Sequence, residues 1–351
     1  MTSRQPLFPT TGAQLRRRWF LAVPLLGAFP GFSIAGKLET PTANPLLVRG
    51  SRTLLGTRVD VAIALQQASE ERLARQGMQL AFSEMARLES LMTRFRSDSD
   101  VAKIGLAAGK APVPVAPEVM SVLRAAQQIH QLSAGAFDPL VGSLTGWNFE
   151  PGKQMAPLAA QLADELPNVD MNALSLDEKR GTAYLARPGM RLDLGGVAKL
   201  PILEAGLDIL ALSGLKHALI NGGGDVLVRG QLHGRPWRVG VRNPQSPAHL
   251  LQVLEVEGAK VVASSGDYER TFTRGGRTFH HILNPRTGWP TEGVRGVTLV
   301  SHSVQEVNGL GASMMVRGPA WARETCARTG LKALLASADG SIWRSPGFAA
   351  A

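Results

Sequence analysis

The spacing of apolar residues switches repeatedly between a strand-like and a helix-like period, and this mixture most constrains the fold. Residues 58–65 alternate between apolar and polar, which is typical of a half-buried strand. Short strand patterns also occupy much of 218–263. Helical spacing is found in four further stretches, at about 70–95, 118–132, 197–212 and 320–328. We therefore predict an α+β fold with a single mixed or antiparallel sheet and flanking helices, because a regular βαβ series is not present.

Local signals place some boundaries of these elements. Ser69 precedes two glutamates and is predicted to cap the first helix. The inward face of that helix is predicted from helical spacing to carry Leu73, Leu80, Ala81, Met85, Leu88 and Met92. The stretch 151–175 is rich in Ala and Pro, has little periodicity and is predicted to be a loop.

The first forty residues have the features of an export signal. A basic cluster at 16–18 precedes a short apolar stretch that Pro24 interrupts. The order Arg17-Arg18, one residue, then Phe20-Leu21 resembles the twin-arginine signal, which implies export of the folded protein to the periplasm. The alternative is a basic amphipathic tail without a targeting role. No later stretch is long and apolar enough to span a membrane, so no span is expected in the mature chain.

The charge balance favours anionic partners. The 351 residues include 38 Lys and Arg against 28 Asp and Glu, a net charge of +10. Nucleic acid is not expected as a partner, because the basic residues are scattered and aromatic residues make up only 5% of the chain. Cys326 is the single cysteine, so no intramolecular disulfide can form.

Glycine-rich turns with single polar residues at fixed offsets are the strongest functional signal. Glycine lets a ligand approach backbone N–H groups closely, and Lys199 near a helix start could reach a phosphate. None of these turns has the spacing of a phosphate-binding P-loop or of a dinucleotide fold. Singly each is weak, and the glycines at 222–224 could form only a tight turn. The segments are Leu55 to Thr57, Gly135 to Pro139, Asp193 to Lys199, Asn221 to Asp225, Ser264 to Arg270 and His281 to Gly288.

In their order and spacing, these segments resemble the FAD:protein FMN transferase family over about residues 50–345. The resemblance implies a flavin-transferase-type domain at 45–348 that binds FAD and Mg²⁺. It implies transfer of FMN from FAD to a Thr or Ser hydroxyl of a partner protein, with release of AMP. The acceptor that it implies is a protein with an FMN-binding domain, as found in membrane electron-transfer complexes.

The same resemblance implies roles for individual residues. His281 would be the base for the acceptor hydroxyl, and Gly196 would offer its carbonyl to Mg²⁺. Two alternatives stay open: His281 could be a surface histidine next to His280, and Asp138 could only cap a turn before a proline. The FAD site would include Leu55, Ala136, Phe137, Asp138, Asp193, Lys199 and Ile282.

Three positions depart from the family pattern. Asn308 and Ala312 stand where members carry an Asp and a Thr that hold Mg²⁺, and Asn284 replaces another Asp. Neutral ligands should hold a hard divalent cation weakly, so the sequence predicts weak Mg²⁺ binding. Besides the exported transferase, three other functions remain open: an FAD- or FMN-binding carrier without transferase activity, a Mg²⁺-dependent FAD pyrophosphatase, and an interaction protein without flavin.

Overall fold

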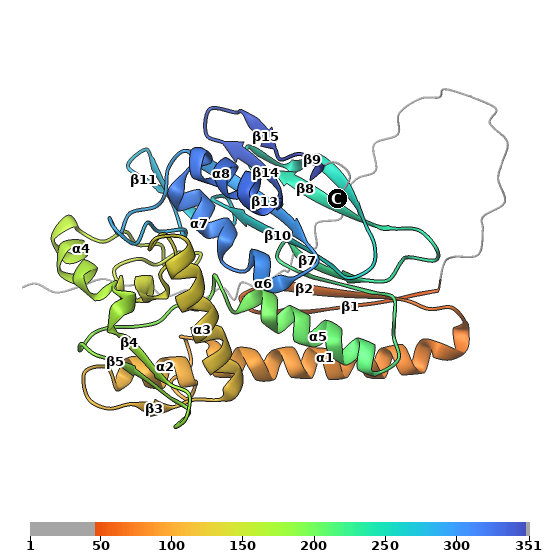
Figure 1. The fold of residues 1–351 in the computed structure, drawn as a ribbon, viewed down its shortest axis with the longest axis horizontal. Helices are drawn as coiled ribbons and strands as arrows, with labels where there is room; N and C mark the ends of the chain where they lie inside the picture. The colour runs from red at the N-terminus through yellow and green to blue at the C-terminus, as the bar shows by residue number, and fades with distance from the viewer. Residues whose placement is uncertain (1–45, 349–351) are drawn as a thin grey trace, which may run out of the picture. The chain divides into compact units, whose positions relative to one another are not determined.

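The computed structural model describes residues 46–348, and Figure 1 shows how their helices and strands are arranged. The predicted export signal at 1–40 lies outside these residues. An eight-stranded sheet forms the centre, and every pair of neighbouring strands in it is antiparallel. The mixed-or-antiparallel sheet that the sequence predicts is therefore antiparallel. In spatial order the strands are β1 (Leu47–Leu54), β2 (Thr57–Ala64), β6 (Ala218–Gly222), β7 (Asp225–Arg229), β10 (Lys260–Gly266), β13 (Val294–Ser301), β14 (Lys332–Ser337) and β15 (Ile342–Arg344).

Helices cover one face of this sheet. α1 (Glu71–Met92) and α5 (Lys199–Leu212) lie side by side against β1, β6 and β7, as Figure 1 shows. α6 (Val304–Val307), α7 (Leu310–Arg317) and α8 (Pro319–Thr329) follow β13 and contact β10, β13 and β14. Side chains such as Val61, Ile220 and Leu299 point into this main core, because successive strand residues face opposite sides.

A β-hairpin covers the other face. β8 (Trp237–Asn243) and β9 (Ser246–Val256) pair with each other and form a separate two-stranded sheet. Trp237 and Val239 pack with Val226 and Val262 of the central sheet in a second buried cluster. The sheet is thus buried on both faces, which explains why few polar residues alternate in its central strands.

A smaller region is inserted between β2 and β6. It contains α2 (Asp100–Leu106), α3 (Pro117–Leu132), α4 (Ala159–Glu165) and a three-stranded sheet. The strands of that sheet are β3 (Val113–Pro114), β5 (Thr182–Leu185) and β4 (Leu174–Asp177). An aromatic cluster around Trp147 joins this region to the hairpin of β11 (Thr271–Arg274) and β12 (Arg277–His280). Short 3-10 turns complete it: η2 (Pro139–Ser143), η3 (Leu166–Asn168) and η4 (Met171–Ala173).

Some local predictions are wrong. Ser69 lies inside the 3-10 turn η1 (Ala68–Glu70), and no side chain caps α1. Leu73 and Leu80 are 44% and 58% exposed, because only one stripe of α1 packs on the core. The stretch predicted as a loop holds α4, η3, η4 and the start of β4. Among residues 46–348, no helix combines the length and the apolar character that a membrane span requires.

Gly142 provides a test of how the inserted region is held against the segment before α5. A Cβ there would stand 2.6 Å from the Leu192 carbonyl carbon and 2.7 Å from the Asp193 nitrogen, and backbone atoms cannot move aside cheaply. We expect Gly142→Ala to lower the free energy of unfolding by about 1–3 kcal/mol, measured by urea denaturation. Gly105→Ala in α2 is the matched control, since its nearest neighbour would be 3.6 Å away. Equal stability of the two variants would contradict this packing.

Candidate functional site

The glycine-rich segments meet at one end of the central sheet. The registers that pair Val59 with Gly222, Gly222 with Asp225 and Gly266 with Gly296 set the β1–β2 turn, the β6–β7 turn and the end of β10 side by side. Loops from the inserted region reach the same end, because Arg286 Nη2 donates a hydrogen bond to the Ala134 carbonyl at 3.0 Å. Segments far apart in the sequence are therefore neighbours in the fold.

The β1–β2 turn is a tight two-residue hairpin. Leu55 and Gly56 have φ angles of +58° and +65°, as in the turn type that matches the twist of paired strands. The Leu55 N–H donates to Glu89 Oε1 of α1 at 2.7 Å, which holds a non-glycine residue in this uncommon conformation. The missing side chain of Gly56 leaves room for Arg270, whose Nη2 lies 2.8 Å from where a Cβ would stand.

The β6–β7 turn anchors Lys199. Asn221 Oδ1 accepts the Gly224 N–H at 3.0 Å, so these glycines do form a tight turn. Asp225, directly after the turn, is buried and faces α5, where its Oδ2 pairs with Lys199 Nζ at 2.8 Å. Its other oxygen accepts the Ser264 N–H at 2.8 Å. The ammonium group therefore has a fixed position at the start of α5.

Asp138 caps a turn. It is buried, its Oδ1 accepts the Leu140 N–H at 2.8 Å, and its Oδ2 accepts the Met171 N–H at 3.2 Å. Burial raises the pKa of this carboxyl above its usual range. The alternative of a turn-capping residue thus describes what the side chain does, and it shapes the loop that carries its buried neighbours Ala136 and Phe137.

Asp193 lies beside that loop. Its N–H donates to the Pro139 carbonyl at 2.7 Å, and its side chain, about one third exposed, accepts the Gly195 N–H and pairs with Arg94 at 3.4 Å. The sequence predicts a helix after Asp193 to Gly196, and α5 does follow them. These residues form turns and α5 begins only at Lys199, because the Asp193 side chain bonds the backbone two residues on in place of a helical carbonyl.

His281 follows β12 and is half-buried, with Nδ1 buried and without a hydrogen-bond partner among the described residues. Its N–H donates to the Arg270 carbonyl at 3.2 Å. Burial, together with the charges of Arg270, His280 and Lys199, lowers the pKa of His281 to about 4. His280 is buried as well and bonds the Thr291 carbonyl through Nε2. Neither histidine is a surface residue, and Ile282 is buried in the main core.

The positions implied for Mg²⁺ are adjacent but poor in suitable ligands. The Phe137 ring lies against Gly196 and Gly309, which brings the segment before α5 to the start of α7. Asn308 is buried, and its Nδ2 donates to the Val197 carbonyl at 2.8 Å, so an N–H group points at an oxygen that could otherwise face a cation. Ala312 packs on the apolar core and supplies no oxygen. Within 46–348, no three His, Cys, Asp or Glu side chains gather as a metal site. These residues do not fit a divalent cation.

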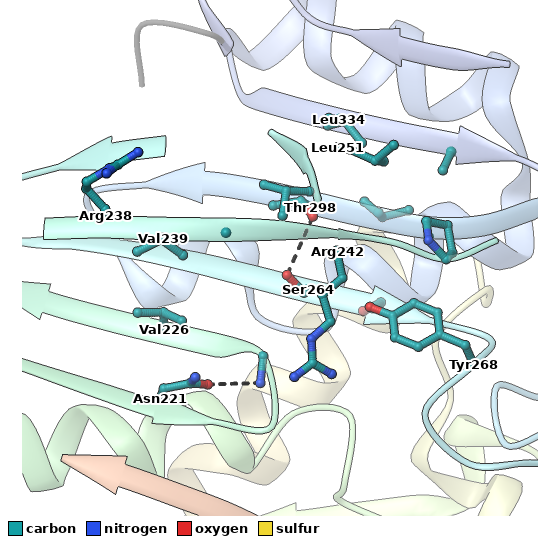
Figure 2. A pocket seen from close by; sticks show the side chains of 18 of the residues that line it. Asn221, Val226, Arg238, Val239, Arg242, Leu251, Ser264, Tyr268, Thr298 and Leu334 are labelled. Carbon is teal, nitrogen blue, oxygen red and sulfur yellow. Dashed lines mark hydrogen bonds between the residues drawn. The ribbon is translucent and has the colours of Figure 1, made fainter. Parts of the chain in front are cut away.

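The structure also contains a cavity that two of the glycine-rich segments help to line, through Asn221, Gly224, Ser264, Ser265 and Tyr268. It has a volume of about 170 Å³ and lies between the central sheet and the β8–β9 hairpin, where Figure 2 shows Arg242 and Tyr268 near Asn221. Ligand pockets commonly measure about 300–1,000 Å³, so this cavity is too small for a whole flavin dinucleotide. His281, Lys199 and Asp193 do not line it.

Sequence reasoning missed two side chains at this end of the sheet. In the sequence Asp225 marks only the end of a glycine-rich turn, although a carboxylate at the start of a buried strand signals a partnered charge. In the sequence Arg270 is only the last residue of a segment, because nothing there shows that its side chain returns to Gly56.

Comparison with known proteins identifies the family. The model of the ApbE family matches residues 55–335. The chain belongs to the ApbE family. A relative from Klebsiella pneumoniae named FAD:protein FMN transferase is 34% identical over 235 residues, 66% of this chain and 71% of that protein. A second relative from the same species, with the same name, is 27% identical and spans 94% of this chain and 96% of its own length.

Solved structures agree with this assignment. The ApbE protein of Thermotoga maritima has a TM-score of 0.78 at 29% identity, covering 86% of this chain and 98% of that chain. The flavin transferase ApbE of Vibrio cholerae superposes with a TM-score of 0.74 at 23% identity, covering 87% and 99%, and supports the fold. The predicted family and the predicted α+β fold are thus confirmed.

Two substitutions test the interpretation of the metal position. Asp at 308 would place a carboxylate against the Val197 carbonyl, and a cation between the two oxygens would relieve that repulsion. We expect Asn308→Asp combined with Ala312→Thr to raise the affinity for Mg²⁺ at least tenfold in isothermal titration calorimetry. Asn308→Ala with Ala312→Val is the control without added oxygens. If the double variant gains no affinity, the metal position has been assigned wrongly.

Proposed function

We propose that this chain is an FAD:protein FMN transferase. The hydroxyl oxygen of a Thr or Ser in the acceptor attacks the FMN-side phosphorus of FAD. The new P–O bond forms as the bond to the bridging oxygen breaks, AMP leaves with that oxygen, and the hydroxyl proton passes to the His281 imidazole. Positioning and charge neutralisation account for most of the barrier lowering in such transfers.

The observation that carries this proposal is the placement of His281. Its imidazole has a pKa well below neutral and is therefore uncharged at pH 7, next to the cationic Lys199 and Arg270. A neutral imidazole can accept a proton, and adjacent cations favour a diphosphate. A pKa near 4 makes His281 a weak base in the free protein, and the negative charges of a bound diphosphate would raise that pKa toward neutral, where a general base is most effective. The names of the relatives and the family support the same activity.

The other residues of the site act mainly by position. Lys199, held by Asp225, offers a fixed positive charge to phosphate oxygens. Leu55 and Ile282 offer apolar contact to the flavin. The Phe137 ring packs between Gly196 and Gly309 and so fixes the position of these two backbone segments. We derive no step through Mg²⁺, because the residues at its implied position do not fit it.

The location and the acceptor are further parts of the proposal. The twin-arginine pattern at 17–21 supports export of the folded chain to the periplasm. An acceptor there would carry an FMN-binding domain and belong to a membrane electron-transfer complex.

Transfer can be measured directly by in-gel flavin fluorescence. Purified protein is incubated with FAD and an FMN-binding acceptor domain, and the acceptor is expected to become fluorescent after denaturing electrophoresis. We expect His281→Ala to slow labelling by roughly 10²–10⁴-fold, the usual contribution of a general base. His249→Ala, on the β8–β9 hairpin, is the control and should label normally. Tight FAD binding without labelling by the unchanged protein would indicate a flavin carrier instead.

The pH dependence tests the environment of His281. Because its pKa lies near 4 in the folded protein, below the ordinary 6.5, the imidazole stays neutral from alkaline pH down to about pH 5. We expect kcat/KM, which reports the free enzyme, to show no step near 6.5 and to fall with an apparent pKa near 4. Circular dichroism at each pH checks that the protein remains folded. An acid limb centred at 6.5 would contradict the half-buried, cation-flanked position of His281.

A further inference from the structure

Arg270 has an unusual position among the arginines at this end of the sheet. Its neighbours in the site are engaged: Arg94 pairs with Asp193, Arg295 pairs with Asp267, and Arg286 bonds the Ala134 carbonyl. Arg270 forms no ion pair and donates no side-chain hydrogen bond to any residue within 46–348. Its charge is therefore not neutralised by a protein group in this part of the chain.

Two contacts place Arg270 between His281 and the β1–β2 turn. The Arg270 carbonyl accepts the His281 N–H at 3.2 Å, just before the first strand pair of the β11–β12 hairpin. The guanidinium returns to the β1–β2 turn, where the left-handed Gly56 makes room for Nη2. Arg270 is exposed, so its guanidinium is accessible to a ligand at the point where the β11–β12 hairpin approaches the β1–β2 turn.

The remaining charges show why such a cation is needed. Asp225 largely neutralises Lys199, and the position implied for Mg²⁺ offers an amide N–H and an alanine instead of carboxylate and hydroxyl oxygens. A flavin dinucleotide carries a diphosphate with two negative charges. Leaving such charges unpaired in a partly buried site is costly.

We propose that the Arg270 guanidinium binds the diphosphate of FAD beside His281 and provides there, together with Lys199, the positive charge that a divalent cation would otherwise supply. The planar guanidinium suits this task because it presents several N–H donors to phosphate oxygens at once. This inference rests on the proposed function, since it names the group that binds the FAD of that reaction. It makes flavin binding by this chain independent of Mg²⁺.

Binding of three flavins separates this role from a structural one. Kd values for FAD, FMN and riboflavin are measured by quenching of flavin fluorescence, with EDTA and with Mg²⁺. We expect Arg270→Gln to weaken FAD binding by roughly tenfold or more, as the loss of charged hydrogen bonds predicts, and riboflavin binding by less than twofold. Arg270→Lys should recover part of the FAD affinity. Arg274→Gln, an exposed neighbour on β11, is the control and should leave all three affinities unchanged.

Each outcome of this experiment counts for or against the proposal. EDTA should leave FAD binding by the unchanged protein unaltered, and the melting temperature of Arg270→Gln should match that of Arg274→Gln. The proposal is overturned if Arg270→Gln binds FAD normally, if it loses riboflavin to the same degree, or if EDTA abolishes FAD binding by the unchanged protein. Absence of acceptor labelling with these binding results intact would refute the transferase activity and leave the role of Arg270 standing.

Discussion

The ion pair of Lys199 with Asp225 is the contact on which the rest of the site depends. Asp225 is buried between the β6–β7 turn and α5, and its second oxygen accepts a backbone N–H of β10. One carboxylate therefore joins a helix start to two strands. Removing either partner of such a buried pair leaves an uncompensated charge, which costs more than the pair itself contributes. The ion pair fixes the position of the Lys199 ammonium group. It also neutralises part of the positive charge that Lys199 could otherwise offer to a ligand.

Close backbone approach is the second constraint, and glycine provides it where side chains cross. Gly196 lies against the Phe137 ring, and a Cβ on Gly311 would stand 2.6 Å from Ser265 Oγ. These contacts bring the segment before α5, the start of α7 and the end of β10 within reach of one another. The glycine-rich segments therefore serve packing between loops as much as any ligand, which explains why each of them looks weak when it is read alone.

The sequence predicted the fold where periodicity was strong and failed where tertiary contacts decide. Alternation located β2, short strand patterns located β6 to β10, and helical spacing located α3 correctly. The sequence does not reveal β1, because this edge strand is mostly exposed and only Val48 in it is buried. It does not reveal β13, because burial on both faces of that strand removes the alternation of apolar and polar residues. The exposure of Leu80 follows from which stripe of α1 meets α5, and no local signal reveals that choice.

The candidate site was predictable as a set of segments and not as a set of contacts. The residues of the family pattern do come to one end of the sheet. Both carboxylate oxygens of Asp138, however, accept hydrogen bonds from backbone N–H groups of the protein. Arg270 could not be recognised, because its significance depends on a turn more than two hundred residues earlier in the chain.

The same distinction applies to the metal position. Asp and Asn have nearly the same shape, but they interact with the Val197 carbonyl in different ways. The amide of Asn308 donates a hydrogen bond to this carbonyl. A carboxylate has no such donor and could approach the carbonyl only with a cation between the two oxygens. The substitution thus favours a closed arrangement of protein groups at the start of α7. With that arrangement in place, the negative charge of a diphosphate has to be neutralised by basic side chains that no acidic group of the protein already neutralises. At this end of the sheet those side chains are Lys199 in part and Arg270 in full.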